Sequence, residues 1–571
     1  MKYKLLTLAA VVGLGFASCS DDPTDQEAPR LFRPVASLEV SGNSIITTWD
    51  NIKEATQYEL VLSRVTATDD LGNNTYEQVR TASVESSPYV WDDLAWDEKY
   101  KVDIKCLNST KQSEVYSTDP VNVNYLSALT SIKLIDNAAR LTWNLGGDSI
   151  RFVRAVPQDN NAAEIVEQKV KTAEYENGYV DIYGLQAETQ YVFYTYKSQS
   201  EQTNSTYAGK LGGTTKASID FDEKYGAGKW IDIRGWDSDM AKDTLKSEVF
   251  WQMVPDGATV ILRGEQEYKV NNAIKLDRSV AFVTGSTLGG NAKFISSGGI
   301  TCASEAVIDK VKFEDIDFIS DKAMPGGGNE IETNTDKGFG GRQVLNNNGT
   351  KSTIKELIFD GCTVTGYRAV VRAQNASDAI QKITFKGCTI NGIGDQGVVT
   401  TTNKAADWQS ISFTDCTITN IVMMCDLRAT AGDLTFTVNQ CTFCYAPIET
   451  TANKNTPLFR FGSNPATLNI TNSLFGPSMA STGSGGEDCL PYQAGTAGSI
   501  FLDNQEAPVS AAHSFKTNFG WTLIGEATYP IDQLTSLSMD ENALWKAPQS
   551  GDYTVIGNIG ESGIGATKWQ Q

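Results

Sequence analysis

Apolar and polar positions follow two different patterns along this chain. In residues 30–216 they alternate in short runs, as in residues 58–62 (Tyr-Glu-Leu-Val-Leu), which predicts strands with one buried face. From about residue 219 a longer pattern recurs, in which an alternating run such as residues 380–386 leads to a small residue, usually a cysteine. A helical pattern is expected only briefly, at residues 238–253. We therefore expect an all-β protein.

The recurring pattern has the period of one coil of a parallel β-helix. Cys362, Cys388, Cys416 and Cys441 stand at the same point of it, and they are 26, 28 and 25 residues apart. Three short strands and three turns fit that length, and each coil buries its inward side chains only against its neighbours. The cysteines are therefore expected to stack inside as small apolar side chains. A leucine-rich repeat has a similar period, but its leucine–asparagine pattern is missing.

Two tryptophan-containing units precede the repeat. Each has a tryptophan in an early strand and, later, a leucine six residues before a tyrosine that begins another strand. In β-sandwiches such a tryptophan fills the space between the sheets, and the tyrosine ties a corner loop to the backbone. The residues are Trp49, Leu94 and Tyr100 in the first unit and Trp143, Leu185 and Tyr191 in the second. Their spacing resembles that of fibronectin type III domains, at residues 30–124 and 125–216, which we expect to act as spacers.

The first thirty residues resemble a lipoprotein export signal. Two lysines precede an apolar run at residues 5–17, which is too short to span a bilayer and has the length of a signal peptide. The run ends in small residues directly before Cys19, as in the bacterial lipobox, and an acidic tract follows at residues 20–27. The resemblance implies that residues 1–18 are removed, that Cys19 is lipidated and that residues 19–29 form a tether. The acidic pair after the cysteine is similar to the surface-export signal of Bacteroidetes lipoproteins, which implies an outer-membrane protein facing the cell exterior.

The whole layout resembles Bacteroidetes surface lipoproteins that combine fibronectin type III modules with a pectate-lyase-like, right-handed parallel β-helix. The β-helix is expected over residues 219–571 with a helical cap at its start, and residues 544–555 resemble the closing segment of that group. Such proteins are typically found with glycan-uptake systems, often for pectin. The resemblance therefore implies a polysaccharide ligand and partners in glycan uptake, but the families concerned are uncharacterised and supply no catalytic motif.

Charge and rare residue types narrow the functions further. The formal net charge is −21, and it falls by two to −23 once Lys2 and Lys4 leave with the signal peptide. Such a surface repels nucleic acid and acidic lipid, and it repels an acidic polysaccharide unless a local cationic patch or a bound cation intervenes. His513 is the single histidine, which excludes a histidine-based triad within this chain. No CxxC pair faces another, so zinc is not expected.

A polar stripe is predicted on one outer face of the β-helix. Counting eight, ten and twelve residues from each column cysteine gives positions that share one face of a strand. Arginine forks match uronate carboxylates, and Asp426 and Glu449 could hold calcium. A solvated face with an arginine–aspartate ion pair is equally compatible with this pattern. The count of ten gives Arg372, Val398, Asp426 and Thr451. The candidate ligand-binding residues are Arg372, Gln374, Asp426, Arg428, Glu449, Asn453 and Arg460.

Three functions remain open after these observations. The first is a surface lipoprotein that binds an acidic, pectic polysaccharide on its β-helix. The second is a polysaccharide lyase that uses Arg372 or Arg428 as the base, although no compact acidic calcium cluster accompanies them. The third is a structural or adhesive surface protein. Residues 334–337 match part of the polygalacturonase pattern, but its other elements are missing, and the glycine-rich insertion that holds them (residues 324–349) is expected to form a loop beside the stripe.

Overall fold

The computed structural model describes most of the chain from Arg30 to Gln570. The predicted signal peptide, Cys19 and the predicted tether lie outside the described residues. Among the helices in the described part, none is long and apolar enough to cross a membrane. The described residues are 30–158, 162–236, 238–270, 274–296, 298–323, 342–375, 379–401, 406–428, 430–431, 433–449, 458–461, 466–477, 479–480, 501–502, 508–517, 529–531 and 533–570.

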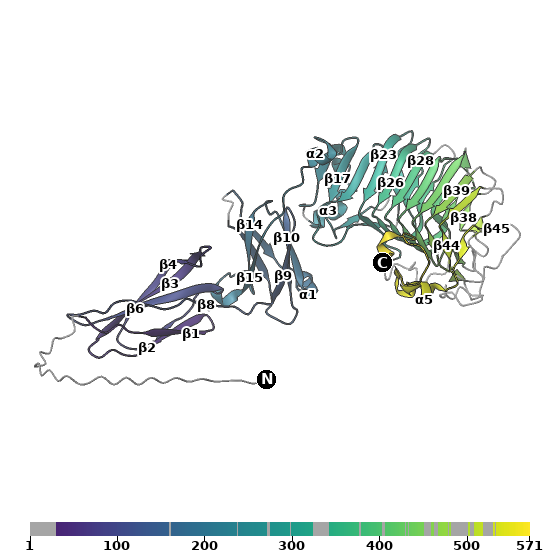
Figure 1. Ribbon diagram of the computed structural model, residues 1–571. Coiled ribbons are helices and arrows are strands. Elements are labelled where there is room, and N and C mark those ends of the chain that lie inside the picture. Colours follow the sequence, from purple (N-terminus) through teal and green to yellow (C-terminus); the bar gives the residue numbers. More distant parts are fainter. Residues whose placement is uncertain are drawn as a thin grey trace, which may run out of the picture.

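The first module is an antiparallel β-sandwich (Figure 1). Trp49 lies between its sheets and is 4% exposed, because its indole fills the gap that the two backbones leave. The Tyr100 hydroxyl accepts a hydrogen bond from the Ala95 backbone N–H at 3.2 Å, which confirms the predicted corner. One sheet contains β1 (Ala36–Ser41), β2 (Ser44–Trp49) and β5 (Tyr89–Trp91); the other contains β4 (Asn74–Val84), β3 (Gln57–Thr68), β6 (Glu98–Leu107), β7 (Tyr116–Ser117) and β8 (Val121–Val123).

The second module repeats this plan. Trp143 is buried between its sheets. Tyr191 accepts a hydrogen bond from the Gln186 N–H at 3.1 Å, in the same corner as Tyr100 of the first module. One sheet contains β13 (Tyr179–Tyr183), β10 (Ala138–Trp143) and β9 (Leu129–Leu134); the other contains β12 (Val166–Lys169), β11 (Phe152–Pro157), β14 (Gln190–Tyr196) and β15 (Tyr207–Thr214), and α1 (Thr172–Asn177) leads into β13.

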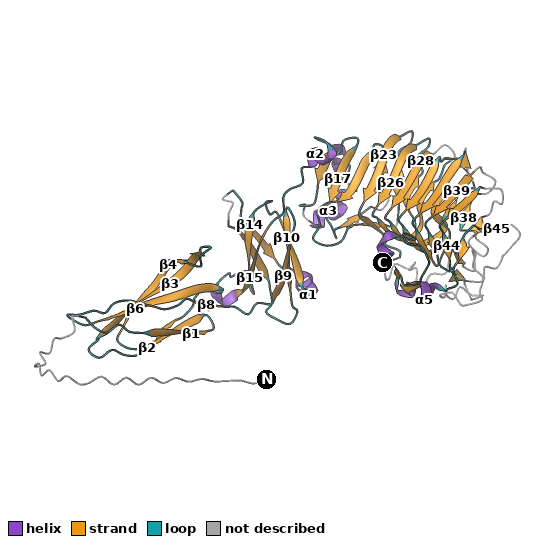
Figure 2. Ribbon diagram, in the orientation of Figure 1, coloured by secondary structure: helices purple, strands orange, loops and turns teal. Residues whose placement is uncertain are grey.

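The third part is a parallel β-helix, in which strands from successive coils pair to form long sheets (Figures 1 and 2). Sheet 1 contains β16 (Trp230–Asp232), β17 (Ala258–Leu262), β20 (Val280–Thr284), β23 (Val307–Glu314), β26 (Thr353–Asp360), β28 (Ala379–Lys386), β31 (Ser410–Thr414), β35 (Leu434–Asn439), β39 (Ala466–Thr471) and β43 (Val509–Ala512), with β30 (Ala406–Asp407) and β34 (Thr430–Ala431) beside β28.

The chain turns from sheet 1 into two further rows of parallel strands, which are continuous with each other through β27 (Thr363–Ala373) and β29 (Thr389–Thr401). Sheet 2 contains the first halves of these strands with β18 (Glu267–Lys269), β21 (Ala292–Ser296), β24 (Ile316–Ser320), β32 (Thr417–Ile421), β36 (Thr442–Cys444), β40 (Leu474–Phe475), β44 (Phe515–Lys516) and β46 (Thr535–Ser536). Sheet 3 contains their second halves with β19 (Lys275–Leu276), β22 (Ile300–Cys302), β25 (Gln343–Asn347), β33 (Cys425–Asp426), β38 (Phe459–Arg460), β42 (Phe501–Leu502) and the antiparallel β45 (Tyr529–Pro530).

A ladder of phenylalanines fills the core beneath sheet 1. Five in-register rings stack along the axis, with neighbouring ring centroids 5.5, 5.2, 4.7 and 4.4 Å apart. Stacking of this kind adds to the free energy of burial, so each coil is stabilised mainly by the coils on either side. The rings belong to Phe282, Phe313, Phe359, Phe385 and Phe413.

The corner between sheets 1 and 2 turns the repeated cysteine into the core. At each corner one residue has a left-handed backbone, such as Gly361 (φ 63°), Gly387 (φ 62°) and Asp415 (φ 58°), which glycine and aspartate tolerate better than most residues. The next side chain then points inward. It is a cysteine in four successive coils and Ile316 in the coil before them. The prediction of a buried column is confirmed, since the four column cysteines are buried and form no disulfide.

A helical cap covers the first coil, but it differs from the single stretch expected at residues 238–253. The structure has two helices there, α3 (Ser238–Thr244) and α4 (Glu248–Met253), after a short α2 (Phe221–Tyr225). The break occurs because the Ser247 hydroxyl accepts a hydrogen bond from the Phe250 N–H and so begins a new helix. Phe250 is buried in the core, which closes its open end.

Buried ion pairs join the second module to the β-helix. Arg234, which is 2% exposed, donates to both carboxylate oxygens of Asp136 at 3.0 Å each and also to Asp232. Beside it, Arg140 of the second module pairs with Glu265 of the β-helix. A buried guanidinium needs such partners, because an unpaired buried charge is strongly destabilising. An apolar cluster of Ile135, Ala138 and Leu288 also joins the two parts.

The C-terminal segment packs across the outside of sheet 2. It contains α5 (Glu541–Leu544), β47 (Trp545–Ala547) and β48 (Asp552–Val555). Its Trp545 and Tyr553 form an apolar cluster with residues of the later coils, such as Leu474. Figure 1 shows this segment in yellow beneath the later coils. One outer face of the β-helix is therefore covered by the chain itself.

Candidate functional site

Polar side chains occupy one in-register row of sheet 3. Arg372 pairs with Asn346 of the preceding coil and with Thr400 of the following coil. Thr400 pairs in turn with Asp426, and Asp426 with Arg460. Neighbouring strands lie about 4.8 Å apart, so the row places side chains at regular steps along the axis. We call these five residues the polar ladder; it brings together Arg372, Asp426 and Arg460 of the predicted stripe.

The prediction that a residue of the stripe lies ten positions after each column cysteine is wrong for two coils. Thr400 pairs with Arg372 where the count gives Val398, because β29 has 13 residues where β27 has 11 and the register shifts between Tyr367 and Ala369. Arg460 pairs with Asp426 where the count gives Thr451, since a longer connection separates the strands of that coil. The stripe therefore continues through Thr400 and Arg460.

Arg372 lies in a group of arginines. Arg368 donates to both carboxylate oxygens of Asp395, at 2.7 and 3.0 Å. Burial lowers the pKa of the Arg372 guanidinium, and the charges of Arg368 and Arg342 lower it further. Two further arginines therefore act on Arg372, and Asp395 balances the charge of one of them, Arg368.

Asp426 is held by arginines. Arg428 donates to both of its carboxylate oxygens at 2.8 Å, and Arg460 Nη1 lies 3.7 Å from Oδ2. The side chain of Arg428 is 50% exposed and that of Asp426 only 15%, so the guanidinium lies on the solvent side of the pair. Both oxygens that would ligate calcium already accept hydrogen bonds. Among the described residues no three His, Cys, Asp or Glu side chains gather as a metal site requires, so the calcium prediction gains no support here.

The other predicted residues lie apart from the polar ladder or outside the described residues. The Gln374 side chain accepts a hydrogen bond from Asn346 Nδ2 at 2.8 Å and so lies beside the ladder. Glu449 belongs to β37 (Ile448–Glu449), which pairs with β41 (Met479–Ala480) and not with the strand of Asp426. Asn453, residues 334–337 and most of the glycine-rich insertion lie outside the described residues.

A second set of outward polar residues was missed by the analysis of the sequence. Thr363, Thr389, Thr417 and Thr442 each follow a column cysteine directly, and they form an in-register row on sheet 2. The repeated Cys-Thr pair is the signal that could have revealed this row. The C-terminal segment that covers it comes from far along the chain, and no local pattern indicates that contact.

Comparisons with known proteins identify no family. No family model and no curated protein matches the chain. Among solved structures, the two-domain fibronectin type III segment of chicken tenascin matches 32% of this chain and 97% of its own length, with 12% identity and a TM-score of 0.15. The FN1-FN3 domains of chicken CNTN1 match 33% of this chain and 65% of their own, with 15% identity and a TM-score of 0.14. On the strand arrangement described above, the chain consists of fibronectin type III-like sandwiches followed by a parallel β-solenoid.

Proposed function

We propose that this protein is a cell-surface lipoprotein that captures an acidic polysaccharide on the outer face of sheet 3. The observation that supports this most is the in-register row of Arg372, Asp426 and Arg460. A linear polymer lying along the axis of the β-helix can meet Arg372 and, three coils further on, Arg460, whereas Thr400 between them is buried. Weak contacts repeated at a fixed spacing add up, because once one unit is bound the next is held at high local concentration.

The chemistry of the ladder suits carboxylate-bearing sugars. A guanidinium presents a planar fork of donors that matches a carboxylate in two parallel hydrogen bonds. Arg342 and Arg372 support an answer to the objection raised by the net charge, because local positive charge can attract a polyanion that the rest of the surface repels. Arg428 and Arg460 already bind the Asp426 carboxylate, which supports their capacity to hold a carboxylate of the ligand.

Lipidation at Cys19 would anchor the protein, and the two modules would hold the β-helix away from the membrane. The apolar run before Cys19 and the acidic tract after it support this part of the proposal. The buried pair between Arg234 and Asp136 supports a spacer that orients the β-helix, because it ties the second module to the first coil. A glycan-uptake system is the expected partner.

A polysaccharide lyase is the second candidate, and one observation favours it. Elimination needs a base at the C5 proton of a uronate, and an arginine serves only if its pKa falls. Burial and two neighbouring arginines lower the pKa of Arg372, which is the required direction. A measurement of ultraviolet absorbance after incubation with polygalacturonate separates the two candidates, because a lyase produces unsaturated uronides that absorb there.

The test is affinity electrophoresis of the full-length protein, kept in detergent, through gels that contain polygalacturonate. Retardation is expected for the wild type and should fall at least tenfold in the double variant Arg372→Ala, Arg460→Ala, since two charge-assisted contacts of about 1.5–3 kcal/mol each are removed. The matched control removes two exposed lysines of β28 in sheet 1, Lys382→Ala with Lys386→Ala, which changes the net charge equally.

The control variant should migrate as the wild type does. If both double variants lose retardation equally, the effect is one of net charge and the ladder is not the site. Wild-type protein that generates unsaturated uronides, with the activity lost in Arg372→Ala, would replace capture by the lyase. No retardation and no product would leave the fold with a structural or adhesive role.

A further inference from the structure

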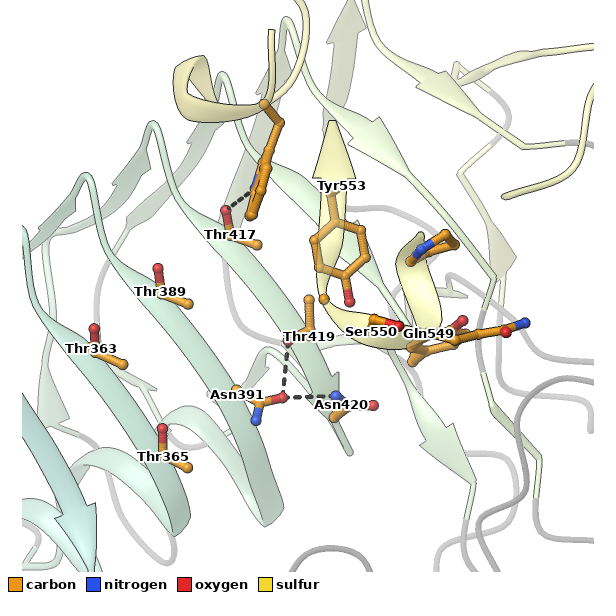
Figure 3. A pocket seen from close by; sticks show the side chains of 14 residues that line it. Thr363, Thr365, Thr389, Asn391, Thr417, Thr419, Asn420, Gln549, Ser550 and Tyr553 are labelled. Carbon is orange, nitrogen blue, oxygen red and sulfur yellow. Dashed lines mark hydrogen bonds between the residues drawn. The ribbon is translucent and has the colours of Figure 1, made fainter. Parts of the chain in front are cut away.

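A groove of about 570 Å³ separates the outer face of sheet 2 from the C-terminal segment. Figure 3 shows its floor, made by side chains of successive coils, and its wall, made by Gln549, Ser550 and Tyr553. The groove lies on the row that follows the column cysteines, whereas the polar ladder lies on sheet 3. It is therefore a different site from the one proposed above.

The floor of the groove offers hydroxyl and amide groups in two columns. Thr363 pairs in register with Thr389, and Thr365 pairs with Asn391, so each pair repeats at a step of about 4.8 Å. Asn391 Oδ1 accepts hydrogen bonds from Thr419 Oγ1 at 3.0 Å and from Asn420 Nδ2 at 2.7 Å (Figure 3). These contacts fix the amide orientation. In the described part of the chain, the hydroxyls of Thr363 and Thr365 make no hydrogen bond to another residue.

The wall is aromatic and is held firmly in place. The Trp569 indole N–H donates to Thr417 Oγ1 at 2.8 Å, and its ring meets that of Tyr553 edge-on with centroids 5.7 Å apart. Thr567 donates to the Asp415 carboxylate through its backbone N–H at 2.6 Å and through its hydroxyl at 2.7 Å. Burial raises the pKa of the Tyr553 phenol, so the group stays protonated and able to donate.

The lining is uncharged. None of the described residues that line the groove is Asp, Glu, Lys or Arg. The Lys568 ammonium that adjoins the lining already donates to the Thr389 hydroxyl. A charged ligand would give up its hydration there with no charged side chain of the lining to receive it, which is unfavourable. The backbone groups of the floor already pair between coils, so an extended peptide cannot join as a further strand. Recognition must therefore come from side-chain hydroxyls, amides and aromatic rings.

We propose that this groove binds an uncharged oligosaccharide. Threonine hydroxyls and the Asn391 amide both donate and accept, as sugar hydroxyls do, so each ring can exchange hydrogen bonds with one rung of the floor. The rings of Tyr553 and Trp569 give the apolar C–H face of a sugar a surface to pack against. The rung spacing is close to the rise of one sugar in an extended chain, which fits several consecutive units.

The experiment measures binding of four neutral probes to the full-length protein: cellohexaose, xylohexaose, mannohexaose and galactohexaose. At least one is expected to bind and to change the fluorescence of Trp569, with Trp569→Phe identifying the signal. The variant Thr363→Val with Thr365→Val removes two floor hydroxyls and keeps the side-chain shape. Its affinity is expected to fall about fivefold, since each hydrogen bond contributes roughly 0.5–1.5 kcal/mol.

Two controls separate this proposal from the function of sheet 3. Thr435→Val with Thr437→Val alters two outward threonines of β35 in sheet 1 and should bind the neutral probe as the wild type does. Arg372→Ala with Arg460→Ala should also keep neutral binding, and the groove variant should keep its retardation by polygalacturonate. Failure of all four probes to bind, or equal affinity in the groove variant and the wild type, would overturn the proposal.

Discussion

The two outer faces that β27 and β29 build differ sharply, although the same strands form both. The first half of each strand places Thr363 or Thr389 on sheet 2, where the C-terminal segment covers an uncharged groove. The second half places Arg372 or Thr400 on sheet 3, in a ladder that carries charge. The inward residues of both halves belong to one core. The difference shows that a β-helix can give neighbouring faces different chemistry without changing its interior.

The two faces should also differ in the distance over which each attracts its ligand. A charged ladder attracts a polyanion over a distance set by salt, whereas a groove of hydroxyls acts only on contact. The core that both faces share should be equally necessary for each of them. Three changes, to the shared core, to the salt concentration and to the charged face, should reveal these differences.

The largest effect is expected from Phe385→Ala, which removes one ring from the stack that both faces share. Phe385 is fully buried, with neighbouring ring centroids at 4.7 and 4.4 Å, so the free energy of unfolding should fall by about 3–5 kcal/mol. Urea denaturation followed by tryptophan fluorescence measures this. Phe385→Leu is the control and should lose clearly less. A loss below about 1 kcal/mol in the alanine variant would contradict a continuous stacked core.

The sequence predicts those parts of the structure that depend on residues close together in the chain. The corner tyrosines Tyr100 and Tyr191 and the cysteine column follow from spacings within one repeat, so the sandwiches and the β-helix could be predicted. The partners of Arg372 could not be predicted reliably, because two extra residues in β29 shift the register. The groove was missed, since the contact between Trp569 and Thr417 joins residues 152 positions apart.

A smaller effect is expected from salt, and it should divide the two faces. Raising the ionic strength from about 0.1 M to about 1 M shortens the Debye length from about 10 Å to about 3 Å. Retention on a polygalacturonate column should weaken by about tenfold, because its contacts are between charges. Binding of the neutral hexasaccharide should stay within about twofold, as its hydrogen bonds carry no net charge. An equal response from both ligands would mean that the faces do not differ as described.

The smallest effect is expected from Asp426→Asn on the charged face. The substitution removes a negative charge from the ladder and frees Arg428 from a bidentate pair. The affinity for polygalacturonate should rise about threefold, and stability should fall by less than about 1 kcal/mol, because Arg428 is half exposed and such pairs are weak. Titration calorimetry and a thermal melt measure the two quantities. Weaker binding would assign Asp426 a direct contact with the ligand.

Capture of an acidic polysaccharide along the polar ladder is tested most directly by a calorimetric titration with galacturonate oligomers of increasing length. The two arginine rungs, Arg372 and Arg460, lie three steps of about 4.8 Å apart, so affinity should rise with length to about four units and then level off. In the Arg372→Ala, Arg460→Ala variant the rise should disappear. The same affinity for short and long oligomers, or the same curve for the variant and the wild type, would contradict capture along the ladder of sheet 3.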